Sequence, residues 1–249
     1  MTRLAGKTAI VTGAGNGFGR GIAERFAAEG AFVVVADLDG EAAEAVARGI
    51  GGSAVAVEAN VAEAGDVERM VQAALDHEGR VDVLVNNAGT THVNKPLLDV
   101  TEDEFDRIVD VNMKAIYRAV LAVVPVMGPQ GGGSIITTAS TAGLRPRPGL
   151  TWYNASKGWA ITATKSMAVE LAATNIRVNC LCPVAGETRM LGEFMGEDTP
   201  ELRAKFRATI PLGRLSTPGD MASAALWLAS DEASFITGVA LEVDGGRCI

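Results

Sequence analysis

The stretch YNASK, residues 153–157, contains two side chains that can donate or accept a proton, four positions apart. Tyr153 is one of two tyrosines in the chain, and Lys157 follows it at the i, i+4 spacing that puts both on one face of a helix. Two unit charges about 5 Å apart at an effective dielectric near 20 interact by roughly 3 kcal/mol, so the ammonium is expected to lower the phenol pKa from about 10 to about 7 or 8. The pair predicts a general acid or base that works near neutral pH.

Three further features favour this chemistry over the commoner arrangement, in which a tyrosine merely packs beneath a lysine stem. Ser140 ends a predicted strand, and the stretch NNAG, residues 86–89, ends another. Because open α/β sheets assemble their sites at the carboxyl ends of strands, both are expected to face one crevice. Asn112 interrupts an apolar helical face, and a buried amide requires hydrogen-bond partners. We expect a water molecule to link Asn112 with Lys157.

A glycine-rich stretch, TGAGNGFG at residues 12–19, follows the first predicted strand directly and opens a helical segment. Gly13, Gly17 and Gly19 let the backbone turn tightly and approach a pyrophosphate, which free N–H groups and the helix dipole stabilise. An ordinary strand-to-helix turn would look similar in isolation. The combination of a strand, a helix and a later acidic residue favours dinucleotide binding.

The later acidic residue is Asp37, which ends the second predicted strand eighteen positions after Gly19. A carboxylate at this place accepts hydrogen bonds from both hydroxyls of the adenosine ribose and repels a 2′-phosphate. The flanking stretch ADLDGE, residues 36–41, contains no lysine or arginine. The sequence therefore predicts NAD(H) in preference to NADP(H), unless Asp37 is only a solvated residue at a strand end.

Short apolar runs rich in β-branched residues alternate with helix-length segments along the chain. Because such runs indicate strands covered on both faces, the pattern predicts a Rossmann-like, doubly wound α/β fold with a seven-stranded parallel sheet and helices on both faces. We expect one domain over residues 1–249. The predicted strands lie within residues 8–12, 31–37, 53–60, 81–87, 134–140, 176–184 and 239–246.

Helical patterns fill the spaces between these runs. One helix is expected to end at Gly49, and another is expected to run over residues 101–127 from a threonine cap and an acidic first turn. A third spans residues 217–230. Residues 186–216 are too long for a connecting loop of this fold and carry scattered methionine, leucine and phenylalanine side chains. They predict a small helical flap beside the site.

The composition argues against several other classes of protein. A formal net charge of −8 and a pI near 4.9 disfavour binding to nucleic acids and anionic membranes, and no Lys/Arg cluster is visible. The longest apolar stretches fall short of the roughly 18 residues that span a bilayer, and no signal-peptide pattern opens the chain, so we expect a cytoplasmic protein. Cys180, Cys182 and Cys248 and the two histidines lack the spacing of a metal or disulfide framework.

These motifs together resemble the short-chain dehydrogenase/reductase family over almost the whole chain. The glycine loop matches TGxxxGxG, residues 86–89 match NNAG, and the Asn–Ser–Tyr–Lys tetrad is matched by Asn112, Ser140, Tyr153 and Lys157. The resemblance implies hydride transfer between nicotinamide C4 and a carbonyl or carbinol carbon, in a homotetramer. Tyr153 would exchange the proton of the substrate oxygen, and Ser140 would orient that oxygen. Lys157 would bind the ribose and lower the tyrosine pKa, and Asn112 would hold a relay water.

Two positions depart from the family pattern. Asn60-Val61 replaces the usual Asp-Val after the third strand, and Asn60 is still expected to bind the adenine amino group. Pro183-Val184 replaces the usual Pro-Gly after the sixth strand, so the nicotinamide pocket is expected to differ slightly. The resemblance implies a cofactor site made of Gly13, Asn16, Gly17, Phe18, Gly19, Asp37, Leu38, Asn60, Val61, Asn87, Ala88, Gly89, Tyr153, Lys157, Pro183, Val184, Gly186 and Thr188.

The expected reaction is the NAD-dependent interconversion of a secondary alcohol and a ketone. The methionine and phenylalanine side chains of the flap, with Leu144 and Trp152, favour an uncharged, apolar substrate, unless they only pack the flap onto its neighbours. Arg145 and Arg147 follow Ser140 in the sequence. They either bind an anionic group of the substrate or lie in solvent or at an interface.

Other functions remain as alternatives. Reduction of 3-oxoacyl groups on an acidic carrier protein is disfavoured by the net charge and by the lack of basic residues in the stretch 123–134. A sugar dehydrogenase is a further enzymatic alternative. From other classes, a non-catalytic dinucleotide sensor would be expected to lack parts of the tetrad, and a Rossmann-like methyltransferase would have no use for the YxxxK spacing.

Overall fold

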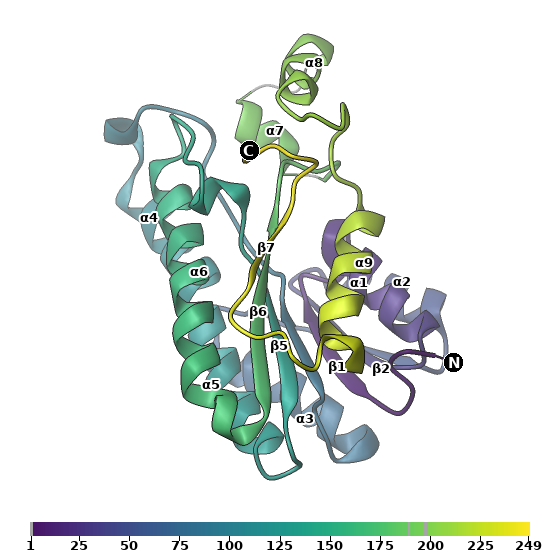
Figure 1. Ribbon diagram of the computed structural model, residues 1–249. Helices are drawn as coiled ribbons and strands as arrows, with labels where there is room; N and C mark the ends of the chain where they lie inside the picture. Colours follow the sequence, from purple (N-terminus) through teal and green to yellow (C-terminus); the bar gives the residue numbers. More distant parts are fainter. Residues whose placement is uncertain (1, 189, 197–198) are drawn as a thin grey trace.

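The parallel sheet is built from strands that are apolar on both faces. The computed structural model describes residues 2–188, 190–196 and 199–249. These residues form a seven-stranded parallel sheet in the order β3-β2-β1-β4-β5-β6-β7, which confirms the predicted doubly wound fold (Figure 1). The strands are Thr8–Thr12 (β1), Phe32–Asp37 (β2), Ala54–Glu58 (β3), Val83–Asn86 (β4), Gly133–Thr138 (β5), Ile176–Pro183 (β6) and Ala240–Val243 (β7).

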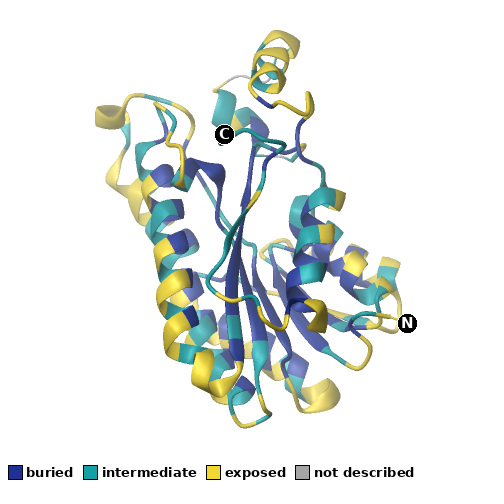
Figure 2. Ribbon diagram, viewed as in Figure 1, coloured by how far each residue is buried: buried dark blue, intermediate teal, exposed yellow. Residues whose placement is uncertain are grey.

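Two layers of helices cover the sheet, one on each face. Helix α1 packs against α9 on one face, and α3 packs against α5 on the other. Figure 2 shows the strands buried between helices whose outer faces are exposed. Among the described helices, none has the length and hydropathy needed to span a membrane. The covering helices are α1 (Gly17–Ala28), α2 (Gly40–Ile50), α3 (Ala64–Glu78), α4 (Glu102–Val109), α5 (Ala115–Met127), α6 (Thr151–Leu171) and α9 (Pro218–Ala229).

The alternation of side chains along β1 explains how one strand supports both layers. Ala9 and Val11 belong to the core on the α1 and α9 side, whereas Ile10 belongs to the core on the α3 and α5 side. Successive side chains of a strand point to opposite faces, so a continuous apolar run is stable only when both faces are covered. Each fully buried aliphatic side chain of this kind contributes roughly 1.5–3 kcal/mol.

Two helix boundaries differ from the sequence prediction. Helix α2 does not end at Gly49 but continues to Ile50, and Gly51 ends it because its φ of 88° suits glycine. The single helix expected over residues 101–127 is two α-helices joined by a π-helical turn at Asp110–Lys114. The expected threonine cap is present, since Thr101 and Glu104 form a capping box at the start of α4.

The flap stands at the carboxyl end of the sheet (Figure 1). It contains α7 (Leu191–Met195) and α8 (Pro200–Ala208), and a parallel bridge between Gly186 and Ser216 closes its base. Within residues 186–216, Arg189, Glu197 and Asp198 lie outside the described part of the chain. The order of the sheet reverses between β1 and β4, and the carboxyl end of such a reversal is where open α/β folds form a crevice.

Candidate active site

A cavity of about 520 Å³ lies where the carboxyl ends of the strands meet the flap. Ser140, Tyr153 and Lys157 line it together with the glycine loop and the ends of β2 and β4. Gly19 and Asn112 are the two residues of the predicted site that do not line this cavity. The chain segments that the sequence analysis singled out, although far apart in sequence, therefore border one space.

The glycine loop has the shape that a pyrophosphate needs. Gly13 and Gly17 have φ values of 62° and 56°, and a Cβ atom on Gly13 would lie 2.9 Å from the Cα of Ala88. A Cβ on Gly19 would lie 2.1 Å from the carbonyl oxygen of Gly13, so Gly19 permits the close packing of α1 and does not border the ligand space. Helix α1 has no acidic residue in its first turn, and its cap residue Asn16 makes no side-chain cap bond. Free N–H groups at a helix start of this kind suit an anion.

The end of β2 offers a carboxylate to the same cavity. Asp37 accepts hydrogen bonds from the backbone N–H of Gly15 at 2.7 Å and of Asp39 at 3.0 Å. Each carboxylate oxygen keeps a further lone pair, so both can still accept a bond from a ribose hydroxyl. Asn60 also lines the cavity, where its Oδ1 accepts a bond from the N–H of Ala62 at 3.0 Å. The pocket therefore fits an adenosine group.

Asn87 holds three strand ends together. Its Nδ2 donates to the carbonyl oxygens of Thr12 and Gly13 at 3.0 and 3.1 Å, and its Oδ1 accepts from the Thr138 hydroxyl at 3.2 Å. Its backbone N–H donates to the Thr12 hydroxyl at 3.0 Å. The side chain of Asn87 thus makes its polar contacts with protein atoms, and its contribution to a ligand site is to fix the crevice between β1, β4 and β5.

Tyr153 lies in the first turn of α6 with 5% of its surface exposed, and its ring centroid is 5.1 Å from that of Phe194. Burial raises the pKa of Tyr153 to about 12, because an ionised phenol would lose its hydration. The hydroxyl of Ser140 and the charge of Arg147 act in the opposite direction. The expectation that Lys157 lowers this pKa to 7 or 8 is wrong: desolvation prevails, and Lys157 is not among the causes that lower it.

Lys157 lies one turn further along α6, also with 5% of its surface exposed. Its Nζ donates to the carbonyl oxygen of Thr138 at 2.8 Å and lies 5.7 Å from the centroid of the Tyr153 ring. Burial lowers the pKa of Lys157 to about 8, because the ammonium loses hydration. No carboxylate of the described residues forms an ion pair with this ammonium. The side chain therefore contacts the end of β5 and the cavity.

Asn112 is almost fully buried in the π-helical turn. Its Oδ1 accepts from the N–H of Thr90 at 2.8 Å, and its Nδ2 donates to the carbonyl oxygen of Thr90 at 2.9 Å and to the hydroxyl of Ser156 at 3.0 Å. The hydroxyl of Ser156 in turn donates to the carbonyl oxygen of Tyr153 at 2.8 Å. Asn112 thus directly joins the loop after β4 to the start of α6.

Val184 explains the departure from the Pro-Gly pattern. Its side chain is buried in a small core with Leu191, Ile210 and Leu215 of the flap, and its carbonyl oxygen accepts a bond from the Ser216 hydroxyl at 3.2 Å. A glycine at this position would remove an apolar contact between the end of β6 and the flap. Valine therefore anchors the flap, which is the physical reason for a branched side chain here.

The expected apolar lining is only partly formed by the predicted residues. Leu144 and Trp152 do not line the cavity, and Trp152 instead packs edge-on against Phe105 with ring centroids 5.3 Å apart. The flap contributes Phe194, Phe206 and Met190 to the cavity wall. These three are among the methionine and phenylalanine side chains of the flap that the sequence analysis expected at the pocket, whereas helical periodicity could not show which of those side chains would pack and which would line the ligand space.

Arg147 also lines the cavity, and its guanidinium carbon lies 4.0 Å from the centroid of the Phe206 ring. Of the two arginines in the loop after Ser140, only Arg147 borders the cavity, while Arg145 is exposed. The Arg-Pro-Arg-Pro stretch at 145–148 was a possible signal, since proline on both sides restricts the backbone of Arg147.

The stretch 123–134 does not bear on the choice of substrate. It comprises the end of α5 and the start of β5, and the cavity lies at the other end of β5, beyond Thr138. The absence of basic residues there is therefore no argument against an acidic carrier protein.

Known proteins match the chain over nearly its full length. A family model described as enoyl-(acyl carrier protein) reductase matches residues 13–247. The 4-formylbenzenesulfonate dehydrogenase of Comamonas testosteroni is 49% identical over 247 residues, which cover 98% of each chain. The 3-oxoacyl-[acyl-carrier-protein] reductase of Thermotoga maritima is 39% identical over 254 residues, which cover 99% of this chain and 100% of that one. A crystal structure of the 3-ketoacyl-(acyl-carrier-protein) reductase from Brucella melitensis with NADH has a TM-score of 0.94 and 50% identity, covering 99% of this chain and 100% of that one.

We expect the substitution Lys157→Met to raise the free energy of unfolding at pH 7. Below pH 8 the folded protein holds an ammonium whose pKa burial lowers from 10.5 to about 8, which corresponds to a cost of up to about 3 kcal/mol. Between pH 8 and 10.5 the unfolded chain binds the proton that the folded lysine has released, so wild-type stability rises and the gain of the variant fades. Urea unfolding at pH 7, 9 and 10.5 measures both effects.

Lys165→Met is the matched control, because Lys165 is exposed on the same helix. It should change the free energy of unfolding little at any of these pH values. A loss of stability in Lys157→Met that is the same at every pH would contradict the assignment of a buried, destabilising charge.

Proposed function

Because this chain belongs to the short-chain dehydrogenase/reductase family, we propose that it is an NAD-dependent oxidoreductase that interconverts a secondary alcohol and a ketone. The observation that carries the proposal is the meeting of Ser140, Tyr153 and Lys157 in the cavity that the glycine loop borders. A bound nicotinamide dinucleotide supplies or accepts the hydride. The residues of the chain bind and orient the substrate and transfer the proton.

Tyr153 is the proposed general acid and base. Its pKa of about 12 keeps the phenol protonated at neutral pH, and this form donates a proton to a carbonyl oxygen as the carbinol forms. In the direction of oxidation a phenolate must accept the proton, and the hydroxyl of Ser140 and the positive charge of Arg147 favour that form. The hydroxyl oxygen of Ser140 accepts a bond from the N–H of Ala142 at 3.0 Å, so its O–H is the donor that bonds Tyr153 in this structure and that would orient the oxygen of a bound substrate.

Asn112 is a positioning residue in this proposal. Its three hydrogen bonds hold the loop after β4 against α6, and so fix Tyr153 relative to the end of β4. Lys157 fixes the same helix to the end of β5 through Thr138. With two such contacts, the phenol keeps a constant place relative to both strand ends, which is the geometry that an oriented hydride and proton transfer requires.

An aromatic or apolar carbonyl compound is the substrate that we favour. Phe194 and Phe206 of the flap line the cavity, where Phe194 contacts the ring of Tyr153 and Phe206 contacts the guanidinium of Arg147. The relative from Comamonas testosteroni is named for 4-formylbenzenesulfonate, an aromatic carbonyl compound with an anionic group, which suits this combination of side chains. Reduction of 3-oxoacyl thioesters is the second candidate, because the matched proteins from Thermotoga maritima and Brucella melitensis carry that name.

We also propose a cytoplasmic location. Cys180 and Cys182 are free and fully buried side by side on one face of β6, and Cys248 is also free. Unpaired thiols are usual in reducing compartments.

The first test is the substitution Tyr153→Phe, with kcat measured for NAD⁺ reduction against secondary alcohols, hydroxyacyl thioesters and sugars. Loss of the phenolic hydroxyl removes the proton exchange, so kcat for the best substrate should fall by roughly 10²–10⁴-fold. Tyr117→Phe is the matched control, because Tyr117 is 59% exposed and lies outside the cavity. A Tyr153→Phe variant with the kcat of the wild type would contradict the catalytic assignment. The compound of the panel with the highest kcat/KM in the wild type decides between the two candidate substrate classes.

The preference for NAD is tested by Asp37→Ser. The carboxylate is proposed to accept two ribose hydroxyls and to repel a 2′-phosphate, so the ratio of kcat/KM for NAD⁺ over NADP⁺ should fall by roughly 10-fold or more. Asp39→Ser is the control: Asp39 caps α2 through the N–H of Ala42, and serine preserves that cap. Equal use of both nucleotides by the wild-type protein would refute the choice of NAD.

We further propose a homotetramer. Tyr117 and Leu121 lie one turn apart on α5 and are 59% and 56% exposed, and Val169 on α6 is 82% exposed. Both helices cover the same face of the sheet (Figure 1). Gathered apolar side chains on an outer face are usual where subunits meet.

Light scattering after size-exclusion chromatography should give the mass of four chains for the wild type and a smaller mass for Leu121→Glu. The glutamate would place a charge in an apolar contact. Leu98→Glu serves as control, since Leu98 is 89% exposed in a short turn before α4. A wild-type mass of one chain would rule out the assembly.

A further inference from the structure

We propose that Arg147 is a specificity-determining residue that binds a carboxylate or sulfonate group of the substrate. This inference rests on the proposed function, because it names the class of substrate that the same cavity takes. Of the possibilities that the sequence left for Arg147, which were anion binding, solvent exposure and an interface, it favours anion binding.

The charges around the cavity are distributed unevenly. Among the described residues that line it, Asp37 is the one carboxylate, whereas Arg107, Arg147 and Lys157 are cations. Asp37 ends β2, three strand positions away from β5 in the sheet, which is a separation of roughly 14 Å. The part of the cavity next to Tyr153 therefore has positive charge without a protein carboxylate to balance it, and an anionic substrate group would supply the balance.

Arg147 is held in place before any substrate arrives. Pro146 and Pro148 restrict the backbone on either side, and the carbonyl oxygen of Arg147 accepts a bond from Nδ2 of Asn154 at 2.7 Å. Asn154 is buried and directly follows Tyr153, so the anchor ties Arg147 to the catalytic helix. The guanidinium lies 4.0 Å above the ring of Phe206 in the flap. A cation fixed at both its backbone and its head loses little freedom when it binds a ligand.

Among the described residues, the guanidinium groups of Arg147 and Arg247 have no hydrogen-bond acceptor and no ion-pair partner. In the part of the chain that the structure describes, neither side chain donates a hydrogen bond or forms an ion pair, and Nε of Arg247 is buried without any partner. Burial, together with the charge of Arg247, lowers the pKa of Arg147 to about 10. The charge of Arg247 disfavours the charged form of Arg147, and an anion bound to Arg147 would offset this repulsion and accept hydrogen bonds from its unused donors.

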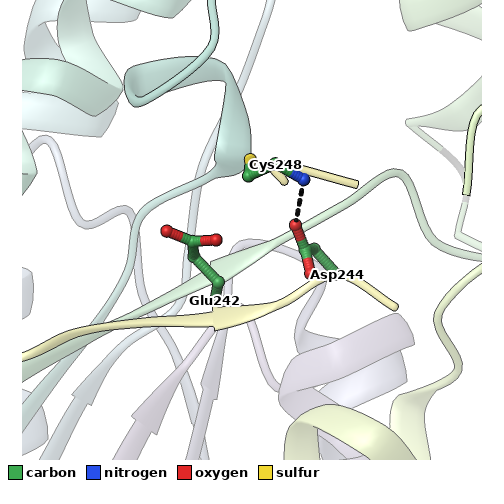
Figure 3. Close-up of side chains that lie close together, drawn as sticks. All are labelled: Glu242, Asp244 and Cys248. Carbon is green, nitrogen blue, oxygen red and sulfur yellow. Dashed lines mark hydrogen bonds between the residues drawn. The ribbon is translucent and has the colours of Figure 1, made fainter. Parts of the chain in front are cut away.

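The C-terminal turn positions Arg247. The carboxylate of Asp244 accepts a bond from the N–H of Gly246 at 2.9 Å and a bond from the N–H of Cys248 at 2.8 Å. Figure 3 shows the bond from Cys248. Arg145 donates from Nη1 to the carbonyl oxygen of Arg247 at 2.9 Å. Glu242, Asp244 and Cys248 offer ligand atoms within 4.8 Å of one another, and burial raises the pKa of Cys248 to about 11. The bonds of Asp244 hold the turn that contains Arg247.

The neighbouring walls indicate the rest of the substrate. Phe194 and Phe206 lie on the flap side of the cavity, and Met190 and Leu150 complete an apolar surface next to Arg147. A flat aromatic ring fits such a surface, with a carbonyl carbon at Tyr153 and an anionic group at Arg147. The substrate class is therefore an aromatic keto acid or the corresponding hydroxy acid.

The test compares matched pairs of ketones that differ only in charge. NADH-dependent reduction of 4-acetylbenzoate is measured against 4-acetylbenzamide, and of 4-acetylbenzenesulfonate against 4-acetylbenzenesulfonamide. The wild-type protein should prefer the anion of each pair by roughly 10- to 100-fold in kcat/KM, since a charged hydrogen bond at a desolvated site has about that value. Equal kcat/KM values within both pairs would overturn the proposal.

Variants assign the preference to its residue. Arg147→Gln should remove most of the preference for the anion, Arg147→Lys should retain part of it, and Arg247→Gln should weaken it less. Arg207→Gln is the control, because it removes the same charge from an exposed position of α8 next to Phe206, and it should keep the wild-type preference. An unchanged preference in Arg147→Gln would overturn the proposal.

A binding measurement separates this inference from the proposed function. Isothermal titration of the four ketones into Tyr153→Phe with NADH present should show tighter binding of the two anions, and the difference should vanish in the double variant with Arg147→Gln. If the wild type reduces none of the ketones but this difference is found, the proposed function fails and the anion site stands. If acids and amides are reduced and bound alike, the anion site fails and the proposed function stands. Reduction of acetoacetyl-coenzyme A that depends on Arg147, with no preference among the acids, would assign the cation to a phosphate and overturn the carboxylate assignment.

Discussion

The hydrogen bond from the Lys157 ammonium to the carbonyl oxygen of Thr138 is the contact on which the site depends. It joins the catalytic helix to the last residue of β5, and Ser140 follows two residues later in the same segment. The ammonium is buried and has no carboxylate partner among the described residues, so the protein bears an electrostatic cost to keep it there. A buried charged residue that lowers the stability of the fold and lines a cavity is typical of functional sites.

The flap completes the cavity through contacts at both of its ends. At its base, Val184 of β6 is buried among flap side chains, and the bridge between Gly186 and Ser216 closes the loop. At its outer end, Phe206 of α8 lies beneath the guanidinium of Arg147, whose backbone is bound to the catalytic helix through Asn154. The wall of the substrate space is therefore attached to the same helix that carries Tyr153, so the position of the flap and the position of the phenol are coupled.

Sequence reasoning succeeded where a local pattern has one structural meaning. The glycine loop, Asp37 at the end of β2 and the i, i+4 pair on α6 follow from rules that involve only neighbouring residues, and the structure places all three around one cavity. It failed where distant contacts decide. The partners of Asn112 come from residues 90 and 156, and the pKa of Tyr153 is set by burial that spacing alone does not reveal. The charge of Arg247 acts on Arg147 although the two are about a hundred positions apart, so no cluster of basic residues is visible in the sequence.

The π-helical turn at Asp110–Lys114 sets the orientation of two separate features, the buried contacts of Asn112 and the outer face of α5. A π turn contains one residue more than an α turn, and each residue rotates a helix by about 100°. Without the extra residue, either Asn112 would leave the polar contacts next to the phenol, or Tyr117 and Leu121 would no longer point outward from α5. A deletion or insertion in this short stretch would change the polar contacts of Asn112 or the exposed apolar face of α5. The sequence of the turn is therefore constrained by the site and by the outer surface at once.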